Sequence, residues 1–198
     1  MTATGTPELR KPLRIVVAED EAIIRLDLVE MLAEEGYNVV GEASRGTTAV
    51  ALVREHRPDL AIFDIKMPEM DGLSAARIVA DEELSGVIVL TAFSQRELIE
   101  QARDAGVLAY LMKPFQKTEL VAAIEVAVSR HRERVALSAE VRSLEDRLET
   151  RKVLDRAKAK LISTGMTEPD AFAHIQREAM NGRTSMKAIA QQILATEP

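Results

Sequence analysis

The chain has 198 residues, a formal net charge of −6 and no cysteine. The missing cysteines exclude disulfides, zinc–thiolate sites, iron–sulfur clusters and thiol nucleophiles. Its 46% hydrophobic and 29% charged residues are typical of a folded globular protein. No apolar run approaches the roughly 18 residues that a membrane span needs, and the N-terminus lacks the apolar core of a signal peptide. We therefore expect a cytoplasmic protein of one or two domains with no membrane partner.

Charge is distributed unevenly along the chain. Residues 1–129 contain 13 Lys and Arg against 22 Asp and Glu. Residues 130–150 contain five of each sign, and residues 151–198 contain eight basic and five acidic residues. An acidic body followed by a basic tail suggests two separate roles, the second involving a polyanion.

Short apolar segments rich in β-branched residues alternate with segments of helical periodicity over the first 130 residues. The expected strands are 13–18, 37–42, 60–64, 87–91 and 109–112. Strands that alternate with helical segments of about 10–15 residues form βαβ units around a parallel sheet. We predict a flexible N-terminus at 1–12 and then, over 13–129, a doubly wound α/β domain of the flavodoxin-like kind with a five-stranded parallel sheet.

A single long helix is predicted next, because residues 115–164 contain neither glycine nor proline. Within its linking segment, residues 130–150, apolar residues recur at steps of four, three and four: Leu137, Val141, Leu144 and Leu148. This a/d spacing over about two heptads predicts a short coiled coil and a homodimer. The alternative is one amphipathic helix folded against its own domain.

Residues 151–198 predict an all-α domain of three helices, the first being the end of the long helix. Gly165 ends that helix, as glycine commonly does. Thr167 begins the S/T-x-x-D/E pattern of a capping box and so starts the second helix. Thr184 is expected to cap the third helix. Phe172 lies on the apolar stripe of the second helix, so we expect it in the core.

Polar residues follow the carboxyl ends of the predicted strands, where open parallel sheets place their sites. Glu19 and Asp20 follow the first strand, and Asp64 ends the third. Thr91 ends the fourth strand and Lys113 follows the fifth. Three adjacent carboxylates repel one another unless a hard cation such as Mg²⁺ neutralises them. An aspartate beside Mg²⁺ can attack a phosphoryl group whose charge a lysine and a hydroxyl offset.

This set of residues resembles the receiver domain of two-component response regulators over roughly residues 13–128. The motifs that carry the resemblance are Glu19-Asp20, the segment DIKMPEMDG from Asp64 to Gly72, Thr91-Ala92 and Lys113-Pro114-Phe115. Their order along the chain and their places at strand ends make the combination far more specific than any one of them.

The resemblance implies that Asp64 accepts a phosphoryl group from a sensor histidine kinase. The implied Mg²⁺ site consists of Asp20, Asp64, the backbone carbonyl of Lys66 and, through water, Glu19. The implied phosphoryl-binding and switch residues are Thr91, Lys113 and the aromatic Tyr110.

Residues 151–194 resemble an ANTAR domain, the RNA-binding module of bacterial antitermination regulators. The matching features are Ala157-Lys158, the break at Gly165, the helix start at Thr167–Ala171, Ile175, Arg177 and the segment Met186–Ala190. Ala159 stands where that family often has glycine, and both residues are small enough for close helix packing. The resemblance implies structured RNA hairpins as targets and control of transcription termination.

Basic residues form the candidate RNA surface, because Lys and Arg neutralise phosphates. The candidates are Arg151, Lys152, Arg156, Lys158, Lys160, His174, Arg177, Arg183 and Lys187. Aromatic residues are scarce in the tail, which favours recognition of a hairpin by shape and backbone, with His174 or Arg177 stacking on a loop base. The alternative is an ordinary solvated helix face whose charges are balanced by nearby acids.

Two other functions fit parts of the sequence. A DNA-binding response regulator with a helix-turn-helix tail would need polar, base-reading residues on the second helix of the pair, whereas SMKAIAQQIL is small and mostly apolar. A phosphatase of the haloacid dehalogenase kind would need a second aspartate where Lys66 stands. We therefore expect a regulator rather than an enzyme, with phosphorylation of Asp64 altering RNA binding through dimerisation.

Overall fold

The computed structural model describes residues 11–92 and 96–195, with the backbone alone at 96–98. Residues 1–10 of the predicted N-terminal segment lie outside this description. The chain divides into two units, one up to Arg134 and the other from Val135 onward. Within the described residues, no helix has the length and apolar character that crossing a membrane requires.

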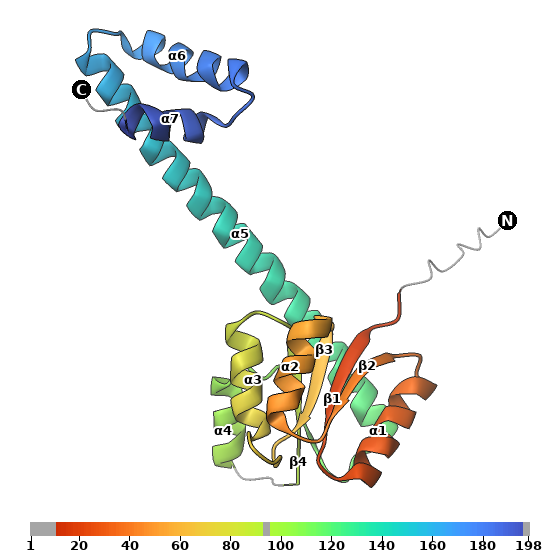
Figure 1. Ribbon diagram of the computed structural model, residues 1–198. Helices are drawn as coiled ribbons and strands as arrows, with labels where there is room; N and C mark the ends of the chain where they lie inside the picture. Colours follow the sequence, from red (N-terminus) through yellow and green to blue (C-terminus); the bar gives the residue numbers. More distant parts are fainter. Residues whose placement is uncertain (1–10, 93–95, 196–198) are drawn as a thin grey trace, which may run out of the picture. The chain divides into compact units, whose positions relative to one another are not determined.

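The first unit is built around a five-stranded parallel sheet of order β2-β1-β3-β4-β5. Its strands are β1 (Arg14–Ala18), β2 (Asn38–Ala43), β3 (Leu60–Asp64), β4 (Gly86–Thr91) and β5 (Ala109–Met112). Its helices are α1 (Ala22–Glu34), α2 (Gly46–His56), α3 (Gly72–Asp81), α4 (Arg96–Asp104) and the beginning of α5 (Lys117–Ser163). The predicted fold class is confirmed, and every expected strand is present. Figure 1 shows β1 to β4 with the helices around them.

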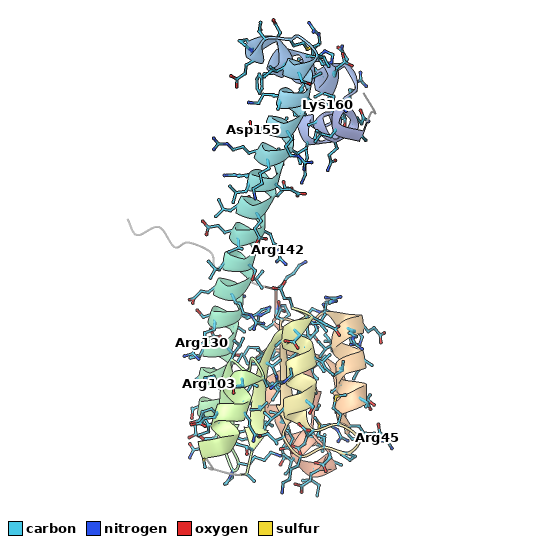
Figure 2. The ribbon with its side chains drawn as sticks, turned by 90° about the vertical axis from the view of Figure 1, so that its left-hand side faces the viewer. Arg45, Arg103, Arg130, Arg142, Asp155 and Lys160 are labelled. Atoms are coloured by element: carbon cyan, nitrogen blue, oxygen red, sulfur yellow. The ribbon has the colours of Figure 1, made fainter. Side chains whose placement is uncertain are left out.

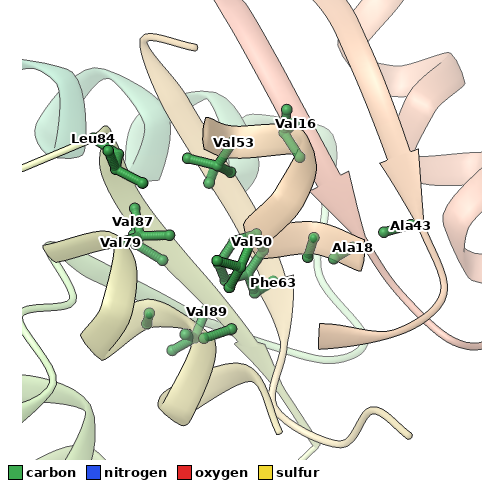
Figure 3. Packing of buried hydrophobic residues seen from close by; sticks show 14 of the residues in the cluster. Val16, Ala18, Ala43, Val50, Val53, Phe63, Val79, Leu84, Val87 and Val89 are labelled. Carbon is green, nitrogen blue, oxygen red and sulfur yellow. The ribbon is translucent and has the colours of Figure 1, made fainter. Parts of the chain in front are cut away.

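Both faces of the sheet are buried, as in other parallel sheets covered by crossover helices. Alternate side chains of each strand point to opposite faces, so Val16 and Ala18 pack toward α2, α3 and α4, while Ile15 and Val17 pack toward α1 and α5. Figure 3 shows the first of these layers, in which Phe63 and Val89 are among the buried side chains. The two layers fix the strands and thereby bring their carboxyl ends together.

The turn after β3 is shaped by a close approach of backbone. A Cβ atom on Gly72 would lie 2.0 Å from the carbonyl oxygen of Asp64, so only glycine fits there. Asp71 caps α3 by accepting a hydrogen bond from the Ser74 backbone N–H at 2.8 Å. This turn follows directly on Asp64, which lies at the carboxyl end of the central strand β3.

The second unit packs α6 (Glu168–Asn181) and α7 (Met186–Ala195) against the C-terminal part of α5. Its small core consists of Ala157, Ile175, Ala179, Ile189 and Ala190. These side chains come from all three helices, which agrees with the predicted three-helix domain.

The helix ends of the second unit follow local capping chemistry, with one correction. Gly165 ends α5 with a φ of +103°, and Thr167 caps α6 by accepting a hydrogen bond from the Asp170 N–H. The expected cap of α7 at Thr184 is wrong. The cap is Ser185, whose Oγ accepts a hydrogen bond from the Ala188 backbone N–H at 3.1 Å. Ser185 directly precedes the first residue of α7, Met186, which is the usual place of a capping residue.

Candidate functional site

Three carboxylates meet at the carboxyl edge of the sheet. Glu19 and Asp20 follow β1, Asp64 ends β3, and ligand oxygens of all three lie within 4.8 Å of one another. Glu19 is fully buried and Asp64 is 6% exposed, while Asp20 faces solvent. We call these residues, with Thr91 and Lys113, the acidic pocket.

Lys113 supplies the positive charge of the acidic pocket. Its Nζ lies 2.5 Å from Glu19 Oε2 and 2.5 Å from Asp64 Oδ1. Burial by itself would lower the pKa of Lys113, but its hydrogen bonds to Asp64 and Glu19 outweigh burial and raise that pKa. Burial also raises the pKa of Glu19, and the hydrogen bond from Lys113 offsets this only in part. The lysine is therefore held as a cation between two carboxylates.

Asp64 remains accessible on one side. Its Oδ2 accepts a hydrogen bond from the Lys66 backbone N–H at 2.8 Å, which fixes the carboxylate. A cavity of about 300 Å³ opens beside it, and its lining includes Asp20, Asp64, Lys66, Thr91, Ala92 and Lys113. The backbone N–H of Lys113 donates to the Thr91 carbonyl at 2.8 Å, so the ends of β4 and β5 hold these two residues next to each other.

Sequence reasoning missed a residue that supports this pocket. Arg25, on α1, donates from Nη1 to the backbone carbonyl of Glu19 at 2.6 Å and lies 3.6 Å from Glu42. Its spacing of six residues from Glu19, which would place it near the loop, was the only available signal.

Tyr110, predicted as a switch residue, is 47% exposed on β5 and is not one of the residues that line the cavity.

The acidic pocket suits a hard divalent cation. Its carboxylate oxygens lie within 4.8 Å of one another, and Lys66 lines the same cavity. Carboxylates, together with a backbone carbonyl and retained waters, are the kind of ligand set that Mg²⁺ takes. Asp20 is exposed, so a cation bound to it could keep water ligands that exchange with solvent. Glu19 is buried and paired with Lys113. Asp20, Asp64 and Lys66 thus fit the direct ligands and Glu19 fits an outer position.

The basic residues at the end of α5 divide between two faces of that helix. At about 100° per residue, Arg151 and Lys158 fall on one face, and Lys152, Arg156 and Lys160 on the other. Figure 2 shows Asp155, from the first face, and Lys160 leaving α5 on different sides. The helical period alone would have separated these residues, which the sequence-based prediction treated as one cluster.

Two of the predicted RNA-binding lysines are already paired with acids. Lys187, on α7, lies 2.7 Å from both Asp146 and Glu149, and the hydrogen bonds to these acids raise its pKa. Lys158 lies 2.9 Å from Asp155 and 3.4 Å from Glu168.

The other predicted RNA-binding residues differ in their exposure to solvent. The side chain of Arg151 is 83% exposed. Four further candidates are also exposed to solvent: Lys152, Arg156, Arg177 and Arg183. His174 and Lys160 are half-buried. The exposed arginines are therefore the stronger candidates for phosphate contacts.

Phe172 is not in the core, which contradicts the expectation from its apolar stripe. It is 46% exposed, because Ala171, Ile175 and Ala179 form the buried line of α6 and Phe172 lies at the edge of that line. It borders an open cavity of about 530 Å³ against α5. We call this cavity the Phe172 pocket; its lining includes Arg147, Arg151, Leu154, Asp155, Lys158 and Phe172.

Comparison with known proteins agrees with both units. Residues 15–125 match the response regulator receiver domain, and residues 142–194 match the ANTAR domain. The chain belongs to the response regulator family. The ANTAR match begins inside the segment 130–150 that was predicted as a linker.

Among relatives of this response regulator is the transcriptional regulatory protein PdtaR of Mycobacterium tuberculosis, which is 57% identical over 93% of this chain and 91% of PdtaR. The predicted resemblance to a regulator with receiver and ANTAR domains is thus confirmed. The chemotaxis protein CheY of Bacillus subtilis is 36% identical and covers 56% of this chain and 93% of CheY.

Solved structures support the receiver fold. The receiver domain of NarL from M. tuberculosis has a TM-score of 0.59 at 34% identity, over 61% of this chain and 98% of that one. The receiver domain of the histidine kinase PA1611 from Pseudomonas aeruginosa, solved with a magnesium ion in its active site cleft, has a TM-score of 0.54 at 28% identity, over 60% of this chain and 98% of that one.

Proposed function

We propose that this response regulator takes a phosphoryl group onto Asp64 from a sensor histidine kinase and binds structured RNA through its ANTAR domain to control transcription termination in the cytoplasm. The observation that carries the first half is the geometry of Asp64. One carboxylate oxygen is held by the Lys66 N–H and the other by Lys113, at the wall of an open cavity.

The acidic pocket can perform phosphoryl transfer with its own residues. Asp64 attacks the phosphorus, and the leaving group departs on the opposite side. Mg²⁺ held by Asp20, Asp64 and the Lys66 carbonyl would offset phosphoryl charge when bound. Lys113 moves from its pairing with Asp64 to the phosphoryl oxygens, and the Thr91 hydroxyl donates to another of them. The receiver catalyses only its own phosphorylation and dephosphorylation, with no separate substrate.

RNA binding is supported by the ANTAR match and by the exposed arginines of the second unit. Most of these residues are on helix faces, where they meet phosphates without inserting into a groove. The alternative of a DNA-binding helix-turn-helix would need α7 as the recognition helix. Its Lys187 is bound to two acids, and Ile189 and Ala190 are buried, which leaves few groups on α7 to read bases.

Dimerisation is the proposed link between the two halves. Leu137, Val141, Leu144 and Leu148 are between 46% and 62% exposed along α5, at coiled-coil spacing. Pairing of two such stripes would present two ANTAR domains to paired hairpins and increase affinity by avidity. Light scattering with and without an acyl phosphate and Mg²⁺ tests this, and an unchanged mass would exclude a dimer switch.

The test of the whole function is a gel shift at stated salt concentration that compares a two-hairpin RNA with duplex DNA. Each is measured with and without an acyl phosphate and Mg²⁺, using wild type and Asp64→Asn. We expect selective RNA binding that responds to acyl phosphate in the wild type and not in Asp64→Asn. Asp81→Asn, an exposed aspartate at the end of α3, is the matched control and should respond like wild type. Binding to DNA alone would support the alternative function.

A further inference from the structure

The Phe172 pocket combines an aromatic surface with walls that contain three basic and two acidic side chains. Phe172 from α6 and Leu154 from α5 supply apolar surface, and Arg147 and Arg151 supply positive charge. The cavity volume of about 530 Å³ lies within the range of ligand-binding pockets. An aromatic ring that is nearly half exposed beside two arginines is the arrangement on which nucleic-acid bases stack.

Two acids line the pocket, Asp155 and the Lys187-paired Asp146, and they favour a base over the phosphate backbone as its occupant. Asp155 lines the pocket, and the hydrogen bond from Lys158 is the main cause of its lowered pKa, so it is an anion at neutral pH. A carboxylate repels phosphates but accepts hydrogen bonds from the N–H groups of base edges. Arg151, 83% exposed and 4.0 Å from Asp155, is free to reach outward to a phosphate.

We propose that the Phe172 pocket binds one unpaired base of an RNA loop, stacked on Phe172, with the adjoining phosphates on Arg147 and Arg151. This rests on the proposed RNA-binding function and specifies its site. It differs from the expectation that His174 or Arg177 stacks on the base. At about 100° per residue, those two residues lie on the side of α6 opposite to Phe172.

The experiment uses the full-length chain and RNA hairpins of one fixed stem with randomised loops. Hairpins that bind the wild type, with or without acyl phosphate, are selected, and their dissociation constants are compared with that of the loop-free stem duplex. Phe172→Leu keeps an apolar side chain but removes the ring, and Phe172→Tyr keeps the ring. Met180→Ala is the control, because Met180 is 72% exposed on the same helix and is not among the residues that line the pocket.

We expect Phe172→Leu to weaken loop binding roughly tenfold or more and to leave duplex binding unchanged. Phe172→Tyr and Met180→Ala should bind like wild type. Circular dichroism checks that each variant is folded, and light scattering gives its mass. Equal loop binding by Phe172→Leu and wild type would overturn the pocket and leave RNA binding intact.

Two further results would also overturn the pocket. If the wild type selects no hairpin over the duplex, no loop base is recognised and the pocket is overturned; the proposed RNA-binding function fails with it only if the wild type binds neither RNA. If Phe172→Leu changes the mass of the protein, the ring belongs to an interface with a second copy of the chain instead of to a base site.

Discussion

The two units of this response regulator arrange charge differently. In the acidic pocket, Glu19 and Asp64 are almost fully buried and share one lysine, so each charge has a defined partner. In the second unit, which we call the ANTAR unit, most basic side chains are exposed, and the paired Lys158 and Lys187 remain partly exposed. A buried site depends on each residue, because an unpaired charge there is costly, whereas a surface site spreads its effect over many weak contacts.

Removal of Lys113 is the strongest test of this difference. Lys113→Met leaves two buried carboxylates without their cation, so we expect the free energy of unfolding of the first unit to fall by about 3–5 kcal/mol. Saturating Mg²⁺ should restore part of it, because a bound cation stabilises the folded state. Urea denaturation followed by circular dichroism measures both effects.

Lys117→Met is the matched control for Lys113→Met. Lys117 pairs with Glu34 and Glu35 at the surface, with 42% of its side chain exposed. We expect a loss of at most about 1 kcal/mol. Equal losses in the two variants would show that the acidic pocket is no more dependent on its lysine than the surface is.

A substitution in the core of the ANTAR unit tests whether the stability of that unit affects phosphorylation in the first unit. Ile175→Ala leaves a cavity among Ala157, Ala179 and Ile189, and we expect it to lower the stability of the second unit by roughly 2–5 kcal/mol. Phosphorylation of Asp64 by an acyl phosphate should proceed at the wild-type rate. Gln176→Ala, on the exposed side of α6, should change neither property. A slower phosphorylation of Ile175→Ala would contradict the independence of the two units.

The cap of α7 offers a smaller effect with a neighbouring control. Ser185→Ala removes the hydrogen bond to the Ala188 N–H and should cost about 1 kcal/mol of the stability of the second unit. Thr184→Ala should cost much less, since its side chain does not cap the helix. Chemical denaturation measures the free energy of unfolding of the two variants. A larger loss of stability for Thr184→Ala than for Ser185→Ala would show that Thr184 is the cap of α7.

We expect a pH effect in the first unit from His131, whose Nδ1 is buried without a hydrogen-bond partner among the described residues. Burial and then Arg134 lower the pKa of His131 below its ordinary value of 6.5, while Asp59 opposes them. Between 6.5 and the lowered pKa the unfolded chain binds more protons than the folded chain, so stability falls as pH drops through this interval.

The measurement for His131 is thermal unfolding over a pH series from neutral to mildly acidic. His131→Gln should show a shallower decline than wild type below about pH 6.5. Identical declines would assign the pH dependence to other groups.

Sequence patterns predicted much of the fold and of the acidic pocket. Strand and helix periods depend on neighbours along the chain, so the five strands and the long helix could be assigned from local order alone. The residues at strand ends followed from the rule that parallel strands share a carboxyl edge, which placed Asp20, Asp64 and Thr91 together.

Contacts between distant segments were decided by the tertiary structure. The ion pair between Glu19 and Lys113 joins residues 94 positions apart, and no local pattern specifies which oxygen the lysine reaches. Likewise, the apolar stripe of α6 could not show that Phe172 lies at its edge, because burial depends on how much of the stripe α5 covers. The sequence by itself determined the elements and the chemistry at their ends, whereas packing decided which groups are enclosed, which are paired and which remain open to a ligand.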